Sequence, residues 1–170
     1  GEGTKRIKRR YPGARLEKLH FEGLDDLDAE ARARYRFMVP GRIRPEGDKL
    51  RVDLLYRSRL VESYAPRASR HSALFTMQAY TKSVTVKLDL PEELEVVQLP
   101  AGHNIDNELL SYELQWKQDG QEVRVQQSLI WKKPLIPKEQ YELLRSLLME
   151  ADQAEEQDLV LRRRRVALLH

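Results

Sequence analysis

The sequence predicts a mainly β fold, an antiparallel β-sandwich with one α-helix near its C-terminal end, and a partly closed barrel is the alternative. Apolar and polar residues alternate with a period of two in several segments, and glycine, proline or aspartate separates these segments. One segment of helical period follows them. The length of 170 residues suits one domain. We expect it over residues 11–161, after a basic linker or leader (1–10) and before a disordered basic tail (162–170).

Residues 31–39 give the clearest strand. Alanine, tyrosine, phenylalanine and valine occupy its odd positions, while Arg32, Arg34 and Arg36 lie between them. A strand that buries one face and exposes the other produces this alternation. The same pattern predicts three further strands and a short final strand, at residues 19–21, 50–54, 84–88 and 159–161.

A hairpin is predicted around Asp119-Gly120, because a type I′ turn needs positive φ at both central residues. With this turn, Trp116 faces Val123, and the apolar residues of both strands share one face. Trp116 and Trp131 occupy apolar positions of this face. We therefore interpret them as core residues rather than as an aromatic platform for sugars.

The predicted helix spans about residues 137–154. Pro137 suits the first position of a helix, where its missing N–H costs nothing. Glu139 and Glu142 lie near the positive end of the helix dipole. Apolar residues recur along one face, which we expect to pack on the sheet: Tyr141, Leu144, Leu148 and Ala151.

The sequence contains no catalytic motif, and we expect a domain that is not an enzyme. Cysteine is absent, which excludes a thiol nucleophile and a zinc ribbon. There is no nucleophile elbow or phosphate-binding loop, and the four histidines are widely spaced. His103 beside Asn104 and Asp106 forms the one faint cluster, which we interpret as a polar loop. No catalytic residue, cofactor or metal is predicted, although two carboxylates that converge in the fold could still act as an acid–base pair.

The net charge of +3 comes from the ends of the chain. Residues 1–10 hold five bases and one acid, and residues 162–165 are four consecutive arginines. Without these residues 21 bases and 26 acids remain, so the body of the chain has a net charge of −5. A weakly acidic body argues against a nucleic-acid-binding domain. No apolar run is long enough to insert into a membrane.

Charge is distributed unevenly along this body. Residues 30–70 hold 11 bases and 5 acids, whereas residues 89–158 hold 6 bases and 16 acids. A solvated sheet face with acidic cross-strand partners is the simpler interpretation. The functional hypothesis is a contact surface for an acidic partner or a neighbouring domain. Its candidate residues are Arg32, Arg34, Arg36, Arg57, Arg59 and Arg70.

Several short motifs together carry a resemblance to a known family. They are Leu90-Pro91, the Val-Val-Gln-Leu-Pro segment at 96–100, Tyr112, the segment 136–145 with Ile-Pro at its start and Tyr141 and Arg145 further on, and residues 11–14 and 22–27. These segments resemble the C-terminal β domain of bacterial transglutaminase-like proteins. In that family, β domains of uncharacterised function flank a papain-like core.

The resemblance implies a periplasmic or cell-envelope location, and it places the catalytic Cys-His-Asp in the preceding core domain. We therefore expect a non-catalytic accessory domain. It would pack on the upstream transglutaminase-like domain of the same chain, or present substrate to it. Two alternatives stay open: an independent module that binds acidic glycans or envelope proteins, and an unrecognised hydrolase that uses carboxylates.

Overall fold

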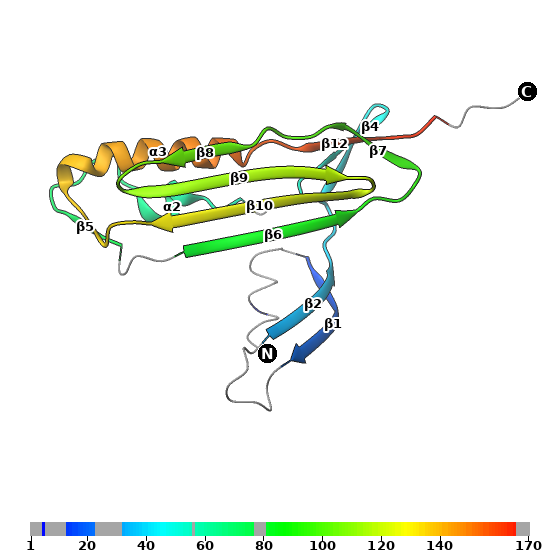
Figure 1. The fold of residues 1–170 in the computed structure, drawn as a ribbon, viewed down its shortest axis with the longest axis horizontal. Helices are drawn as coiled ribbons and strands as arrows, with labels where there is room; N and C mark the ends of the chain where they lie inside the picture. Colours follow the sequence, from blue (N-terminus) through cyan, green and yellow to red (C-terminus); the bar gives the residue numbers. More distant parts are fainter. Residues whose placement is uncertain (1–4, 6–12, 23–31, 56, 77–80, 166–170) are drawn as a thin grey trace, which may run out of the picture. The chain divides into compact units, whose positions relative to one another are not determined.

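The computed structural model describes Lys5 and residues 13–22, 32–55, 57–76 and 81–165 (Figure 1). The chain divides into two compact units, Gly1–Ile43 and Arg44–His170. The prediction of one domain over residues 11–161 stays a prediction, because division into two compact units does not show that either unit folds without the other. Apart from Lys5, the expected linker or leader lies outside the described residues.

The first unit contains an antiparallel pair of strands, β1 (Arg15–Glu22) and β2 (Arg32–Met38). The strand predicted at residues 31–39 is therefore confirmed. The register places Leu19 opposite Tyr35 and Lys18 opposite Arg36. Apolar positions thus face apolar positions in the middle of the pair, whereas the charged positions are mixed, because Glu22 lies opposite Arg32.

Two four-stranded antiparallel sheets form most of the second unit. The strands of the long sheet follow the order β6 (Thr81–Asp89), β10 (Glu122–Trp131), β9 (Leu110–Asp119) and β8 (His103–Asp106). Those of the short sheet follow the order β3 (Ile43–Glu46), β4 (Lys49–Val52), β12 (Leu159–Arg163) and β7 (Leu94–Gln98). A small ribbon pairs β5 (Leu74–Phe75) with β11 (Leu135–Ile136). The mainly β antiparallel fold is confirmed, and among the described strands no sheet closes into a barrel.

The helices of the second unit are α2 (Leu60–Tyr64), the 3₁₀ turn η1 (Lys138–Gln140) and α3 (Tyr141–Ala154). The predicted C-terminal helix is confirmed, but α3 begins at Tyr141 rather than at Pro137, which instead caps η1 with ψ of 151°. The sequence does not predict α2, because five residues are too few to show a helical period. No described helix combines the length and the apolar character needed to cross a membrane.

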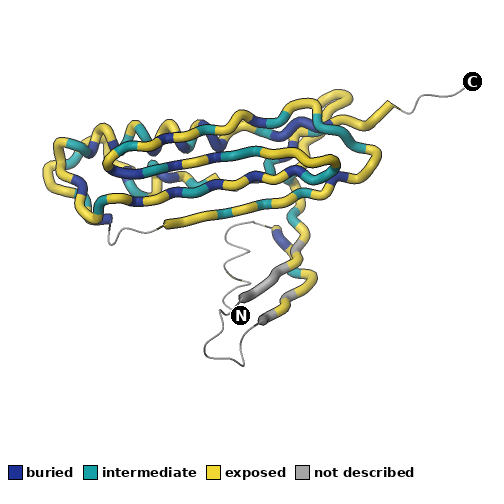
Figure 2. The backbone as a smooth tube through the Cα atoms, viewed as in Figure 1, coloured by how far each residue is buried: buried dark blue, intermediate teal, exposed yellow. Residues whose placement is uncertain are grey.

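The core of the second unit consists of two clusters of buried side chains. In the larger cluster α3 packs Tyr141, Leu144 and Leu148 against the long sheet. The smaller cluster lies between the two sheets and contains Val52, Leu90, Val123, Leu159 and Leu161. Trp131 is buried in the larger cluster and Trp116 packs against both, so their interpretation as core residues is confirmed. Figure 2 shows buried and exposed residues alternating along β9 and β10, as expected for a sheet with one covered face.

The β9–β10 hairpin forms, but its predicted register is wrong by two residues. Gly120 and Gln121 are the central turn residues, and Trp116 lies opposite Val125 rather than Val123. Gly120 has φ of +56°, while φ at Gln121 is not positive. Positive φ at the first central residue alone is the pattern of a type II′ turn, not of the expected type I′. Because a shift of two keeps each side chain on its face, the predicted apolar faces are still correct.

The disordered tail predicted from Arg162 onward is wrong for its first residues. Arg162 continues β12, and its Nε lies 2.6 Å from Oε1 of Glu95 on the neighbouring strand β7. The backbone N–H of Arg164 donates to the carbonyl of Glu93 at 2.8 Å. Residues 166–170 lie outside the described residues.

Candidate functional site

The C-terminal end of α3 carries acids where helices more often carry bases. Asp152 lies in its last turn and Glu155 is its C-cap residue, and no base lies in this turn. The partial charge at a helix C-terminus is negative, so acids are disfavoured there unless other groups compensate them. The compensating groups come from distant parts of the sequence.

Asp152 caps α2 across the fold. Its Oδ1 accepts the N–H of Leu60 at 2.7 Å, and its Oδ2 accepts the N–H of Val61 at 3.0 Å. The residue at the N-cap of α2, Arg59, makes no side-chain capping hydrogen bond to the backbone of the helix. A carboxylate here satisfies N–H groups that no helical carbonyl reaches, and it meets the positive end of the helix dipole. Asp152 therefore replaces a local N-cap side chain.

Glu155 is the centre of a buried polar cluster. Its Oε2 accepts the N–H of Ser58 at 2.5 Å, and its Oε1 accepts the hydroxyl of Tyr112 at 3.1 Å and a hydrogen bond from the amide of Gln127. The amide of Gln127 also donates to Oγ of Ser58 at 2.8 Å. Glu155 and Gln127 are only 3% and 5% exposed. Together with Asp152, this cluster attaches residues 58–61, which we call the clamped segment, to α3 and to the long sheet.

Burial dominates the acid–base properties of this cluster. Desolvation raises the pKa of Glu155, and the hydrogen bond from the Ser58 N–H offsets part of that effect. Desolvation also raises the pKa of Tyr112, and the nearby negative charge of Glu155 raises it further. Tyr112 therefore stays protonated at neutral pH, where its hydroxyl donates a hydrogen bond to Glu155.

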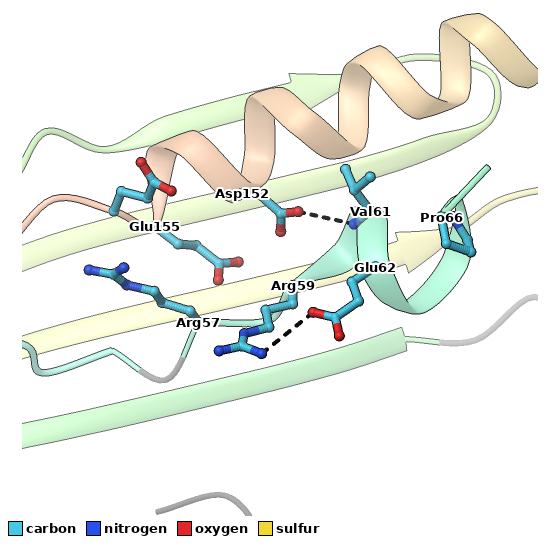
Figure 3. Close-up of a pocket in the computed structure, with 8 residues that line it drawn as sticks. Arg57, Arg59, Val61, Glu62, Pro66, Asp152 and Glu155 are labelled. Carbon is cyan, nitrogen blue, oxygen red and sulfur yellow. Dashed lines mark hydrogen bonds and ion pairs between the residues drawn. The ribbon is translucent and has the colours of Figure 1, made fainter. Parts of the chain in front are cut away.

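A cleft of about 520 Å³ opens beside the clamped segment (Figure 3). Its lining combines two arginines with four acids: Arg57, Arg59, Val61, Glu62, Pro66, Asp152, Glu155 and Glu156. Arg59 lies 3.5 Å from Glu62 in an exposed ion pair. Its φ of 49° is the one positive value at a non-glycine residue in the described part of the chain. Such a backbone conformation persists where surrounding contacts enforce it, and here the cap from Asp152 follows at the next two residues.

A buried carboxyl group with a raised pKa beside a cleft is a feature of general acids, so this arrangement bears on the hydrolase alternative. The hydrogen bonds support a structural role instead. Both oxygens of Asp152 accept backbone N–H groups, and both oxygens of Glu155 accept hydrogen bonds within the protein. Every oxygen of these two acids already accepts a hydrogen bond from the protein, and both acids hold the clamped segment in place.

The six arginines of the hypothetical contact surface are divided between the two units. Arg32, Arg34 and Arg36 alternate along β2 of the first unit, where Arg36 is exposed and the side chains of the other two are outside the description. In the second unit, Arg57 and Arg59 line the cleft. Arg70 places its guanidinium carbon 5.8 Å from the ring centroid of Tyr141. A contact surface that includes all six stays a prediction.

The faint cluster at residues 103–106 forms part of β8 rather than a polar loop. Nε2 of His103 lies 2.7 Å from Oε1 of Glu150 on α3, whereas Oδ1 of Asp106 lies 2.5 Å from Nζ of Lys132. The two side chains therefore have different partners. Among the described residues, no group of three or more histidine, aspartate or glutamate side chains is arranged to hold a metal ion.

Residues 52–161 match a protein family described as a domain of unknown function with a solved structure (DUF3858). The chain belongs to this family. The match begins at the end of β4 and ends within β12, so the DUF3858 region contains the long sheet, α3 and the cleft. No curated protein matches the sequence.

One solved structure shares the fold of this DUF3858 chain, a "putative protease" from Parabacteroides distasonis ATCC 8503. The TM-score is 0.55 and the sequence identity is 14%. The similarity covers 69% of this chain but 24% of the other, so this chain corresponds to about a quarter of the Parabacteroides protein. At this identity the likeness concerns the fold alone.

Sequence reasoning missed Asp152, Glu155 and Gln127 of the DUF3858 region. One signal was present, because four acids and no base occur at the helix end, at residues 152, 155, 156 and 158. A second signal was the pair of polar residues, Tyr112 and Gln127, on the apolar face of the predicted hairpin. Neither signal identifies the backbone N–H groups of the clamped segment, which are distant in sequence.

Proposed function

We propose that this DUF3858 chain is a non-catalytic accessory domain of a bacterial envelope protein with a transglutaminase-like core, and that it packs on this core or presents substrate to it. The observation that carries the proposal is the size of the match to the Parabacteroides protein. The same fold makes up 24% of a longer chain that is described as a protease. A fold used in this way is one part of a larger polypeptide.

The chemistry of the chain agrees with this proposal. A papain-like reaction needs a cysteine nucleophile, and this sequence contains no cysteine. Two of the four acids that line its cleft, Asp152 and Glu155, accept hydrogen bonds from Ser58, Leu60, Val61 and Tyr112. Catalysis would therefore reside in the core domain, and the role of this chain would be contact.

We place the contact surface on β2, at Arg32, Arg34 and Arg36. The register sets Arg36 opposite Lys18, so two like charges face each other there, whereas Arg34 lies opposite His20 and Arg32 opposite Glu22. Like charges that face each other destabilise a strand pair, and a lone two-stranded ribbon has little stability of its own. An acidic partner surface would relieve the repulsion and support the ribbon.

Titration of the separately produced core domain tests this proposal. Reversal of the three β2 arginines to glutamate should weaken binding roughly tenfold or more, and added salt should reduce the difference. Reversal of three exposed bases of the second unit that are not candidate contact residues, Arg67, Lys117 and Lys138, gives a control with the same change in net charge and should leave the affinity unchanged. Circular dichroism confirms that each variant is folded.

If the core domain does not bind the wild-type chain, the accessory role is wrong. Binding of an acidic glycan in place of the core would favour the independent module. Unchanged affinity of the β2 variant would reject this face as the contact surface.

A hydrolase that uses Glu155 is the second candidate, because the pKa of this buried acid beside the cleft is raised. Hydrolysis of polysaccharide or peptide substrates by the isolated chain, abolished in Glu155→Gln while the fold is kept, would support it. We expect no turnover by the wild-type chain.

A further inference from the structure

Among the described strands, β6 is a long edge strand of the second unit. Its nine residues pair with β10 on one side, and the strand order of the long sheet ends with it (Figure 1). The register with β10 runs from Asp89 opposite Glu122 to Thr81 opposite Ile130 without a shift. Proteins usually shorten, bulge or cover such an edge, because its free N–H and C=O groups attract another strand.

One hydrogen bond shows which residues direct their backbone groups to the open side. The N–H of Leu90 donates to the carbonyl of Gln121 at 2.8 Å, which continues the β6–β10 ladder. In an antiparallel pair, residues alternate between those bonded to the partner strand and those that point away. The even-numbered residues of β6 therefore bond to β10. The open edge receives the backbone groups of Ser83, Thr85, Lys87 and Asp89.

The side chains of β6 also leave the core incompletely covered. Val86 and Leu88 face the core but are only partly buried, whereas Val125 and Val123, their partners on β10, are 0% exposed. Val84 is likewise partly buried. A strand added to this edge would remove water from all three side chains.

We propose that β6 pairs antiparallel with β6 of a second copy of this chain, around a two-fold axis at Val86. In this register Val84 lies opposite Leu88, and Val86 lies opposite its own copy. The partly exposed apolar residues thus cover each other on the core side. The residues whose backbone groups face the open edge are paired, because Thr85 lies opposite Lys87 and Ser83 opposite Asp89.

Charge also favours a second copy as the occupant. Across the proposed interface no two like charges face each other, since Lys87 meets Thr85 and Asp89 meets Ser83. A two-fold interface must be complementary to itself, and this strand meets that condition on both of its faces. The two long sheets would become one continuous sheet. Moving the axis to Lys87 would instead place the two copies of this lysine opposite each other, which is less favourable.

A pair of charge variants at Thr85 tests the interface. Within one chain this residue lies opposite Gln126, which is uncharged, so a new charge meets no charged partner directly across the sheet. In the dimer it lies opposite Lys87 of the second copy. Thr85→Lys should therefore weaken the dimer and Thr85→Glu should strengthen it, with dissociation constants that differ roughly tenfold or more at low salt.

Sedimentation over a wide concentration range measures these constants. Gln126→Lys and Gln126→Glu carry the same charges one strand away from the edge, and their dissociation constants should be nearly equal. Thr85→Pro removes an N–H that points to the open edge and keeps the ladder with β10, so this variant should be folded and monomeric. A wild-type chain that stays monomeric at every concentration overturns the proposal. So does equal association of the lysine and glutamate variants, or a Thr85→Pro variant that dimerises like wild type.

Discussion

The two ends of the long sheet are covered in different ways. α3 packs where β9 carries Tyr112 and Leu114, and the short sheet packs where β9 carries Trp116. The helix-covered end contains the buried polar residues Gln127 and Glu155, whereas every buried residue of the sheet-covered cluster is apolar. Strands satisfy their backbone groups in their own ladders, so two sheets can meet through apolar side chains alone. The start of α2 leaves N–H groups unsatisfied, and polar side chains must reach them inside the fold.

Removal of apolar volume beneath α3 should have the largest effect. Leu144 is fully buried in the larger cluster. Leu144→Ala should cost about 2–5 kcal/mol of unfolding free energy through lost burial and a residual cavity. Its sequence neighbour Leu143 is 47% exposed, so Leu143→Ala is a matched control that should cost less than about 0.5 kcal/mol. Urea unfolding measures both changes, and equal losses would contradict the assigned helix face.

Loss of the buried acid should have the next largest effect. Glu155→Ala leaves the Ser58 N–H, the Tyr112 hydroxyl and the Gln127 amide without their shared acceptor, which should cost about 1–3 kcal/mol. Glu156 lines the same cleft but is exposed. Glu156→Ala should therefore change stability by less than about 0.5 kcal/mol. If the two alanine variants are equally stable, the polar cluster does not hold the helix-covered end together.

At the sheet-covered end, the turn between β9 and β10 should be more sensitive to backbone conformation than to packing. An alanine side chain at Gly120 would meet no atom within 4 Å, but φ at this residue is +56°. Gly120→Ala should thus cost about 1–2 kcal/mol through backbone strain alone. Unchanged thermal stability would show that the turn adopts a different conformation.

The smallest expected effects are opposite dependences of stability on pH. Burial raises the pKa of Glu155, so the folded chain keeps this proton over a range above the ordinary value of 4.5, in which the unfolded chain has lost it. The contribution of this group to stability therefore falls as pH rises through that range, and Glu155→Gln should remove the fall.

The hydrogen bond from Lys132 lowers the pKa of exposed Asp106. The contribution of Asp106 to the unfolding free energy is therefore present at pH values above 3.8, the ordinary pKa of this group, and is lost as the pH falls below it. Asp106→Asn should remove that loss.

Urea unfolding from acidic to neutral pH gives the difference in unfolding free energy between wild type and each of the two variants. If these two differences changed with pH in the same direction, the contrast between a buried acid and an exposed one would be contradicted.

The sequence predicts the sheet-covered end better than the helix-covered end. Alternation along β9 and β10 identifies the buried faces, because side-chain direction in a strand depends on position alone. α3 is also predicted from the sequence, because its apolar stripe repeats with a helical period over several turns. The turn is predicted one residue too early, which shifts the register by two, since Asp119-Gly120 matches a type I′ turn as well as Gly120-Gln121 matches type II′.

The candidate site is less predictable for a physical reason. The bonds that form it join residues far apart in the sequence, such as Asp152 to Leu60 and Glu155 to Ser58. The acceptors are visible as unusual acids at a helix end, but the donors are backbone N–H groups that every residue carries. Only the folded arrangement shows which of them are brought to α3.

Hydrogen exchange at three amides tests most directly the central claim that the acids of α3 hold the clamped segment. In the wild-type chain the amides of Ser58, Leu60 and Val61 should exchange slowly. Asp152→Ala should accelerate exchange at Leu60 and Val61, and Glu155→Ala at Ser58, each roughly tenfold relative to the amide of Val125 in β10. Fast exchange at all three amides in the wild-type chain, or rates that neither variant changes, would contradict the claim.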